Sequence, residues 1–202
     1  AGAAAAREGA ATPLQIYALQ FAFVFATVLT FPYFIPFIGH AGAASPALAG
    51  LLFGLPHLVY LLCALPLSRY LGRDGLIVTL ALSFLLLAVS LVGQAWAASL
   101  PALAAWRVVM GCAMTAAYIG LHGLIAGLVN SDNAGRTFGW FESSSKWGAV
   151  GAGLIAGIAV QALDLRTPFV IGALVMFMAA AWLAALALYG RQQPISKEKS
   201  CN

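Results

Sequence analysis

The sequence predicts an all-α membrane protein with six transmembrane helices, and composition and patterning both support this prediction. Apolar residues make up 62% of the 202 residues and charged residues only 8%, whereas soluble proteins are about 25% charged. The apolar residues also form long blocks, and a helix needs roughly 20 of them to cross about 30 Å of hydrocarbon. A transmembrane β-barrel is disfavoured because its strands are only about 9–11 residues long and alternate in polarity.

The polar breaks between the apolar blocks give the expected boundaries. A Gly- and Ala-rich linker covers 1–13, and a first helix interrupted by Pro32 and Pro36 covers 14–38. The remaining helices are expected at 47–67, 76–98, 103–129, 139–161 and 168–189, followed by a polar cytoplasmic tail at 190–202. A first residue other than Met, without a secretory signal, favours a chain that belongs to a longer protein.

The charges of the loops predict the orientation of the helices. Seven of the ten Lys and Arg residues lie on one side of the expected bundle, Arg166 alone lies on the other, and two lie within helices. Basic loop residues concentrate on the cytoplasmic side of membrane proteins. We therefore expect a multi-pass protein of the cell inner membrane with both termini in the cytoplasm. The positive net charge then requires no nucleic-acid partner.

Polar side chains within the expected helices are the candidate functional residues, because a bilayer tolerates such groups only at a cost. The candidates for substrate binding or coupling are Arg107, Glu142, Lys146, His57, Tyr60, His122, Tyr118 and Gln20. The sequence contains no phosphate-binding loop, metal-ligand pair or nucleophile elbow. We therefore expect neither an enzyme nor a cofactor or metal site.

Two interpretations apply to the charged residues of the fifth helix. Glu142 and Lys146 are four residues apart and share one helical face. They could form a local ion pair, or they could face a central cavity as a proton site and a cation site. His122 is expected at a depth similar to that of Lys146, so a proton relay of His, Glu and Lys is a further hypothesis.

The other two ionisable candidates also leave alternatives open. Arg107 could snorkel to the outer surface; otherwise we expect it to face inward and to interact with a carboxylate or a polar neighbour. His57 lies beside Pro56 near the middle of its helix. It could be a hydrogen-bonded packing residue, or it could line a cavity where the proline interrupts the helical hydrogen bonds.

Small residues recur at four-residue spacing in the fifth helix, and this pattern predicts close packing against another helix. They are Gly148, Ala149, Ala152, Gly153, Ala156 and Gly157.

The layout resembles one half of a major facilitator superfamily transporter. The family's motif after the second helix runs from a Gly through an Asp to basic residues around a Gly. Leu65 and Arg69 replace the first two of these residues here, whereas Gly72 and Arg73 match the end of the motif. This departure resembles the degenerate copy found in the second half of such transporters.

Two further motifs carry the resemblance. Leu103, Arg107 and Gly111 resemble the family's membrane-buried Arg motif, which is stronger in first halves. The fifth helix resembles the antiporter Gly motif at Gly139, Gly148, Ala152 and Gly157, with Gly153 in the place of a Pro, as in second halves. Taken together, the departures favour the second half.

The segment 138–148 is similar to exporters of hydroxycarboxylate siderophores within this family. The resemblance implies a secondary transporter with alternating access and a midplane cavity between two six-helix halves. It also implies proton-coupled efflux, as in an antiporter, of a small polar or anionic molecule, either a siderophore or a drug-like compound. The expected partners are that substrate, the lipid bilayer and the other half. A non-transporting membrane scaffold or partner-binding subunit is the alternative.

The charge asymmetry can be tested by labelling single cysteines in intact cells. We expect Arg69→Cys and Arg136→Cys to be protected from an impermeant maleimide and Asp164→Cys to react with it. Labelling of position 69 from outside would overturn the orientation.

Overall fold

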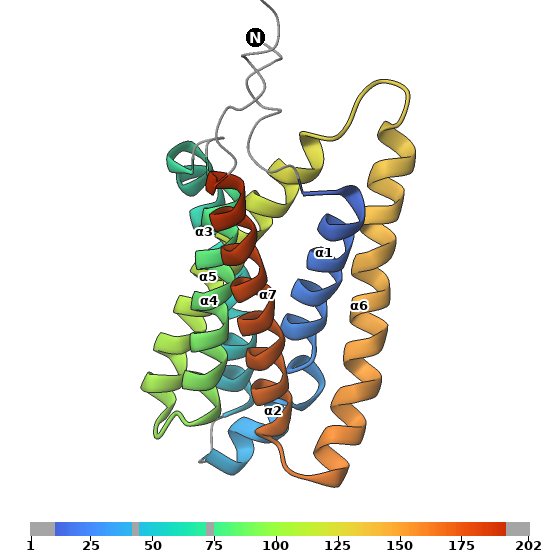
Figure 1. The fold of residues 1–202 in the computed structure, drawn as a ribbon. Coiled ribbons are helices and arrows are strands. Elements are labelled where there is room, and N and C mark those ends of the chain that lie inside the picture. Colours follow the sequence, from blue (N-terminus) through green and yellow to red (C-terminus); the bar gives the residue numbers. More distant parts are fainter. Residues whose placement is uncertain (1–10, 42–44, 72–74, 193–202) are drawn as a thin grey trace, which may run out of the picture.

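The computed structural model describes residues 11–41, 45–71 and 75–192, and every regular element within them is an α-helix. The helices form an elongated bundle in which long helices run side by side (Figure 1). Their bounds are α1 Pro13–Val28, α2 Phe31–Ala41, α3 Pro46–Tyr70, α4 Leu76–Ala95, α5 Leu100–Ala126, α6 Ala134–Ala162 and α7 Thr167–Gln192.

The first expected helix is divided into α1 and α2, and the division lies before the prolines rather than at them. Helix α1 ends at Val28 and α2 begins at Phe31. Pro32 has no N–H to donate to the carbonyl of Val28, so the helical ladder cannot continue through this point. The Thr30 hydroxyl instead donates to the Thr27 carbonyl at 3.2 Å.

Five stretches are long and apolar enough to cross a membrane: Pro13–Gly39, Pro46–Tyr70, Leu76–Ala95, Leu100–Ala126 and Thr167–Leu188. Helix α6 is not among them, because its first half carries charged and hydroxyl side chains. It is nevertheless 29 residues long and runs beside α1 along the bundle (Figure 1). With α1 and α2 taken as one broken span, the fold is an all-α membrane bundle of six spans.

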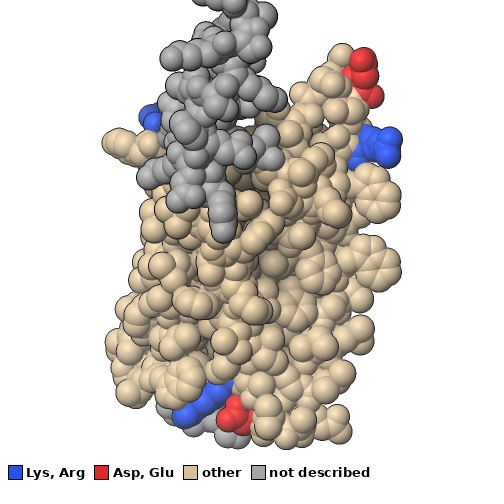
Figure 2. Space-filling model, in the orientation of Figure 1, with Lys and Arg blue, Asp and Glu red and all other residues tan. Residues whose placement is uncertain are grey.

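One side of the bundle, formed by α4 and α7, lacks ionisable side chains along its membrane-spanning stretch. The most extensive contacts join α4 to α7 and α5, α1 to α6, and α3 to α5. Neither α4 nor the Thr167–Leu188 part of α7 contains an ionisable side chain. On the side where α7 lies in front, the visible charged side chains lie at the two ends of the bundle (Figure 2). This side therefore fits contact with lipid.

Helix α6 packs closely against α1 at Gly148. A Cβ atom on Gly148 would lie 2.7 Å from the Phe21 carbonyl oxygen and 3.3 Å from the Phe25 backbone nitrogen. Ala152 and Ala156 continue this buried line along α6, whereas Gly153 is exposed. The small residues thus allow close packing along one line, through Gly148 rather than Gly153.

This geometry predicts opposite effects for two identical substitutions in α6. Gly148→Ala should lower the free energy of unfolding by about 1–3 kcal/mol, because the added methyl group meets the α1 backbone. Gly153→Ala has nothing within 4 Å of the added Cβ atom and should be neutral or stabilising by up to about 1 kcal/mol. Chemical unfolding of the purified protein in detergent measures both. Equal effects would contradict the packing described here.

Candidate functional site

Arg107 of α5 is buried completely, with 0% of its surface exposed. Its Nε donates to the Leu52 carbonyl at 3.0 Å, its Nη1 donates to Gln94 Oε1 at 3.4 Å, and its Nη2 donates to the Phe53 carbonyl. The guanidinium carbon lies 4.0 Å from the centre of the Phe34 ring. Arg107 therefore faces inward and does not snorkel. Its acceptors are an amide oxygen, two backbone carbonyls and, at 3.7 Å, the Met110 sulfur, with no carboxylate among the described residues.

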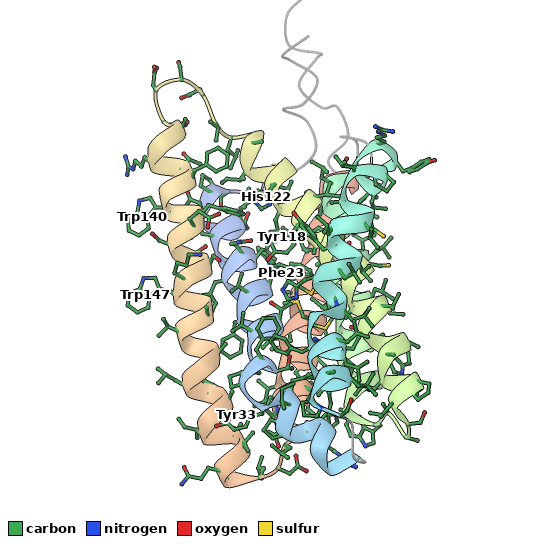
Figure 3. All side chains as sticks on the ribbon, turned by 180° about the vertical axis from the view of Figure 1, so that it is seen from behind. Phe23, Tyr33, Tyr118, His122, Trp140 and Trp147 are labelled. Atoms are coloured by element: carbon green, nitrogen blue, oxygen red, sulfur yellow. The ribbon has the colours of Figure 1, made fainter. Side chains whose placement is uncertain are left out.

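A chain of ring contacts links α1, α3, α5 and α6. Tyr118 of α5 lies edge-on to Phe23 of α1, with ring centres 4.9 Å apart, and to Tyr60 of α3 at 5.4 Å. His122, one turn further along α5, lies 6.0 Å from the Tyr118 ring and 5.3 Å from that of Phe141 on α6. Figure 3 shows Phe23, Tyr118 and His122 between α1 and α3, on the side of the bundle opposite to Figure 1. This side thus combines aromatic surface with hydroxyl and imidazole groups.

Glu142 and Lys146 do not form the local ion pair that the sequence left as one alternative. Both side chains are exposed, and no ion pair joins them in the part of the chain that the structure describes. Glu142 lies within electrostatic range of the Tyr118 hydroxyl group. Because Lys146 follows Glu142 by four residues, it lies on the same face of α6, one turn further along.

The structure brings only part of the expected relay together. His122 contacts Phe141, which directly precedes Glu142. The His122 imidazole Nδ1 lies 2.9 Å from the Tyr118 carbonyl oxygen, so it is held by its own helix. His122 and Glu142 therefore border the same region, and no described contact includes Lys146.

Gln20 lies one turn before Phe23 on α1 and is 2% exposed. Its side-chain oxygen has no hydrogen-bond partner among the described residues. A buried amide oxygen without a donor is unusual in proteins, and it leaves Gln20 able to accept a hydrogen bond.

His57 is exposed on α3 rather than enclosed by the bundle. Its ring lies edge-on to Phe31, with centres 5.8 Å apart, and it is within electrostatic range of Arg107. The expected loop motif at Gly72 and Arg73 lies outside the described residues.

Sequence reasoning missed Gln94, although it holds Arg107 directly. It lies in a stretch that is otherwise close to uniformly apolar, and a single amide in such a stretch was the available signal. The Phe34 ring gave no comparable signal, because an aromatic residue in a membrane helix is ordinary. No group of three or more His, Cys, Asp or Glu side chains suited to a metal ion occurs among the described residues.

A separate depression of about 480 Å³ lies at the end of the bundle where α6 joins α7. It is lined by Phe37, Val160, Asp164 and Arg166, among others. Hydrogen bonds, above all with the Thr167 side chain, hold the pKa of Asp164 below its ordinary value. The depression includes none of the candidate residues above, so we do not assign it to their site.

Comparison with known families gives one match, which covers most of the chain. A family model described as the Major Facilitator Superfamily matches residues 16–200. No individual curated protein matches the chain.

The exposed geometry of Glu142 and Lys146 leads to a stability prediction. Glu142→Gln and Lys146→Gln should have additive effects on the free energy of unfolding, with a coupling below about 0.5 kcal/mol, because no ion pair is lost. A double-mutant cycle by chemical unfolding in detergent measures this coupling. If the double variant recovered most of what either single variant loses, a local ion pair would exist after all.

Proposed function

Because the chain belongs to the Major Facilitator Superfamily, whose members are transporters, we propose that it is the second six-helix half of a proton-coupled exporter. Its substrate is a small polar or anionic molecule, either a siderophore of the hydroxycarboxylate type or a drug-like compound. The exporter resides in the cell inner membrane with both termini of this chain in the cytoplasm. This orientation rests on the asymmetry of the basic loop residues.

One observation carries the proposal: the candidate polar groups gather on one side of the bundle. Tyr60, Tyr118, His122 and Phe141 come from three helices and are joined by ring contacts, and Glu142 directly follows Phe141. The opposite side is formed by α4 and α7, which carry no ionisable group along the membrane-spanning stretch. Exposure of a charged side to lipid is energetically unfavourable. A second six-helix half would enclose it and would complete a cavity at mid-membrane.

Glu142 is the proposed proton-coupling group. It is the only Asp or Glu residue within the six expected helices. It is exposed on α6 and directly follows Phe141, whose ring contacts that of His122. A carboxylate that can reach a water-filled cavity can take up and release a proton as the cavity opens to either side.

Lys146 is the proposed contact for an anionic substrate. Its charge is not neutralised by Glu142 in the described structure, and Ser143, Ser144 and Ser145 make the preceding turn polar. The alternative of a non-transporting scaffold requires Arg107, Glu142 and Lys146 only to pair or to snorkel. The free Glu142 and Lys146 side chains favour the transporter.

Proton exchange in everted membrane vesicles tests this proposal with the full-length transporter. The vesicles are acidified inside by respiration, and a hydroxycarboxylate siderophore is added outside. We expect the internal pH to rise as protons leave in exchange for the siderophore, and Glu142→Gln should abolish this rise. Asp164→Asn is the matched control, because it removes a carboxylate from an exposed loop, and it should behave like the wild type.

The outcomes separate the parts of the proposal. A normal response of Glu142→Gln would remove Glu142 as the coupling group. Uptake of siderophore without a change of internal pH would contradict proton coupling. The absence of any response to siderophores and to a panel of cationic drugs would favour the scaffold.

A further inference from the structure

Pro56 leaves one backbone carbonyl of α3 without its helical donor. In an α-helix the N–H of residue 56 would donate to the carbonyl of Leu52, but proline has no N–H. Leu52 is 3% exposed, so water cannot readily supply the missing bond. A carbonyl inside a membrane needs a hydrogen-bond donor from the protein, because lipid supplies none. Another group must therefore donate to the Leu52 carbonyl.

The side chain of Arg107 supplies that bond. Its Nε donates to the Leu52 carbonyl at 3.0 Å, and its Nη2 donates to the next carbonyl, that of Phe53. The planar guanidinium group presents donors in a rigid fork, which suits two successive carbonyl oxygens better than a Lys ammonium group would. Arg107 therefore donates to the turn of α3 in which Pro56 removes a helical hydrogen bond.

Gly111 brings the two helices close enough for this contact. It lies one turn after Arg107 on α5, and a Cβ atom there would lie 2.9 Å from the Pro56 carbonyl oxygen and 2.6 Å from the Val59 Cβ atom. The spacing of Arg107 and Gly111 on α5 thus matches that of Leu52 and Pro56 on α3. The four residues form a single contact between the helices.

We infer that Arg107 is a positioning residue that gives α3 the hydrogen bond withheld by Pro56, and that it contacts neither substrate nor the transported proton. This assignment goes beyond the proposed function and replaces the expectation that Arg107 binds substrate. Its Nε and both Nη atoms donate to groups of the bundle, and no part of its surface is exposed. A substrate could reach it only if these bonds were broken.

The contact explains how α3 presents its polar residues. His57 directly follows Pro56, and Tyr60 follows one turn later, where it meets Tyr118. A proline within a helix removes one hydrogen bond of the helical ladder, and sharp kinks of helices commonly occur at such residues. Arg107 bonds α3 before the proline, at Leu52 and Phe53, and Gly111 packs against Pro56 and Val59. Helix α5 therefore contacts α3 on both sides of the missing hydrogen bond and supports the turn that carries His57 and Tyr60.

A suppressor experiment on the full-length protein tests this inference. Arg107→Met keeps much of the side-chain volume and removes every donor. We expect the apparent melting temperature in detergent to fall by roughly 5–10 °C and vesicle transport to be lost. Pro56→Ala restores the N–H that can donate to Leu52. The double variant Arg107→Met/Pro56→Ala should recover most of the melting temperature and a substantial part of transport.

Pro66 provides the matched control, because it lies in the same helix but is exposed and remote from Arg107. Pro66→Ala should not rescue Arg107→Met. Rescue by both alanine variants would indicate general stiffening of α3 and would overturn the assignment. So would recovered stability with no transport by Arg107→Met/Pro56→Ala, because Arg107 would then act on substrate or proton directly. The melting temperatures decide the structural part even if the exporter proposal fails, since they require no substrate.

Discussion

A buried positive charge without a carboxylate partner constrains the packing of this bundle more than any other described feature. The Arg107 guanidinium can remain in a membrane interior only if its donors are met by strong acceptors. The bundle provides two backbone carbonyls from α3, an amide oxygen from α4 and the face of an aromatic ring from α2. Four helices must therefore meet at one point, and the helical hydrogen bond missing at Pro56 is part of that arrangement.

Close contact between helices in this bundle depends on small residues. Hydrophobic burial cannot drive helices together in lipid, so close contact depends on small residues and on interhelical polar bonds. Gly148 serves the pair of α1 and α6, and Gly111 serves the pair of α3 and α5. Between these two pairs lie the Tyr118 and His122 rings (Figure 3). The two close helix pairs thus flank the side of the bundle that carries the proposed binding and coupling residues.

The fold was largely predictable, whereas the site was predictable only as a set of residue types. Apolar blocks of about 20 residues and the family motifs indicated six spans in half of a major facilitator fold, and the structure and family match support this. The break before Phe31 was misplaced, because the effect of Pro32 falls on the carbonyl four residues earlier. The local ion pair of Glu142 and Lys146 was a reasonable alternative by helical spacing, but spacing does not determine rotamers. Arg107 was predicted as a candidate for substrate binding or coupling that faces inward, and the structure shows its inward orientation and its polar partners on α3 and α4.

The sequence by itself determined that this protein lies in a membrane, because its composition cannot cover a soluble surface with charge. It also determined which residues are out of place in lipid, since the energetic cost of a charge depends mainly on its depth along a helix. Only the tertiary structure decided what surrounds each of these residues. Arg107 and Glu142 are both ionisable residues within expected membrane helices, yet one is enclosed by carbonyls and the other is exposed. The physical reason is that the partners of a side chain in this bundle come from other helices. The separation in sequence between Arg107 and Leu52 or Gln94 does not predict that these residues will be in contact.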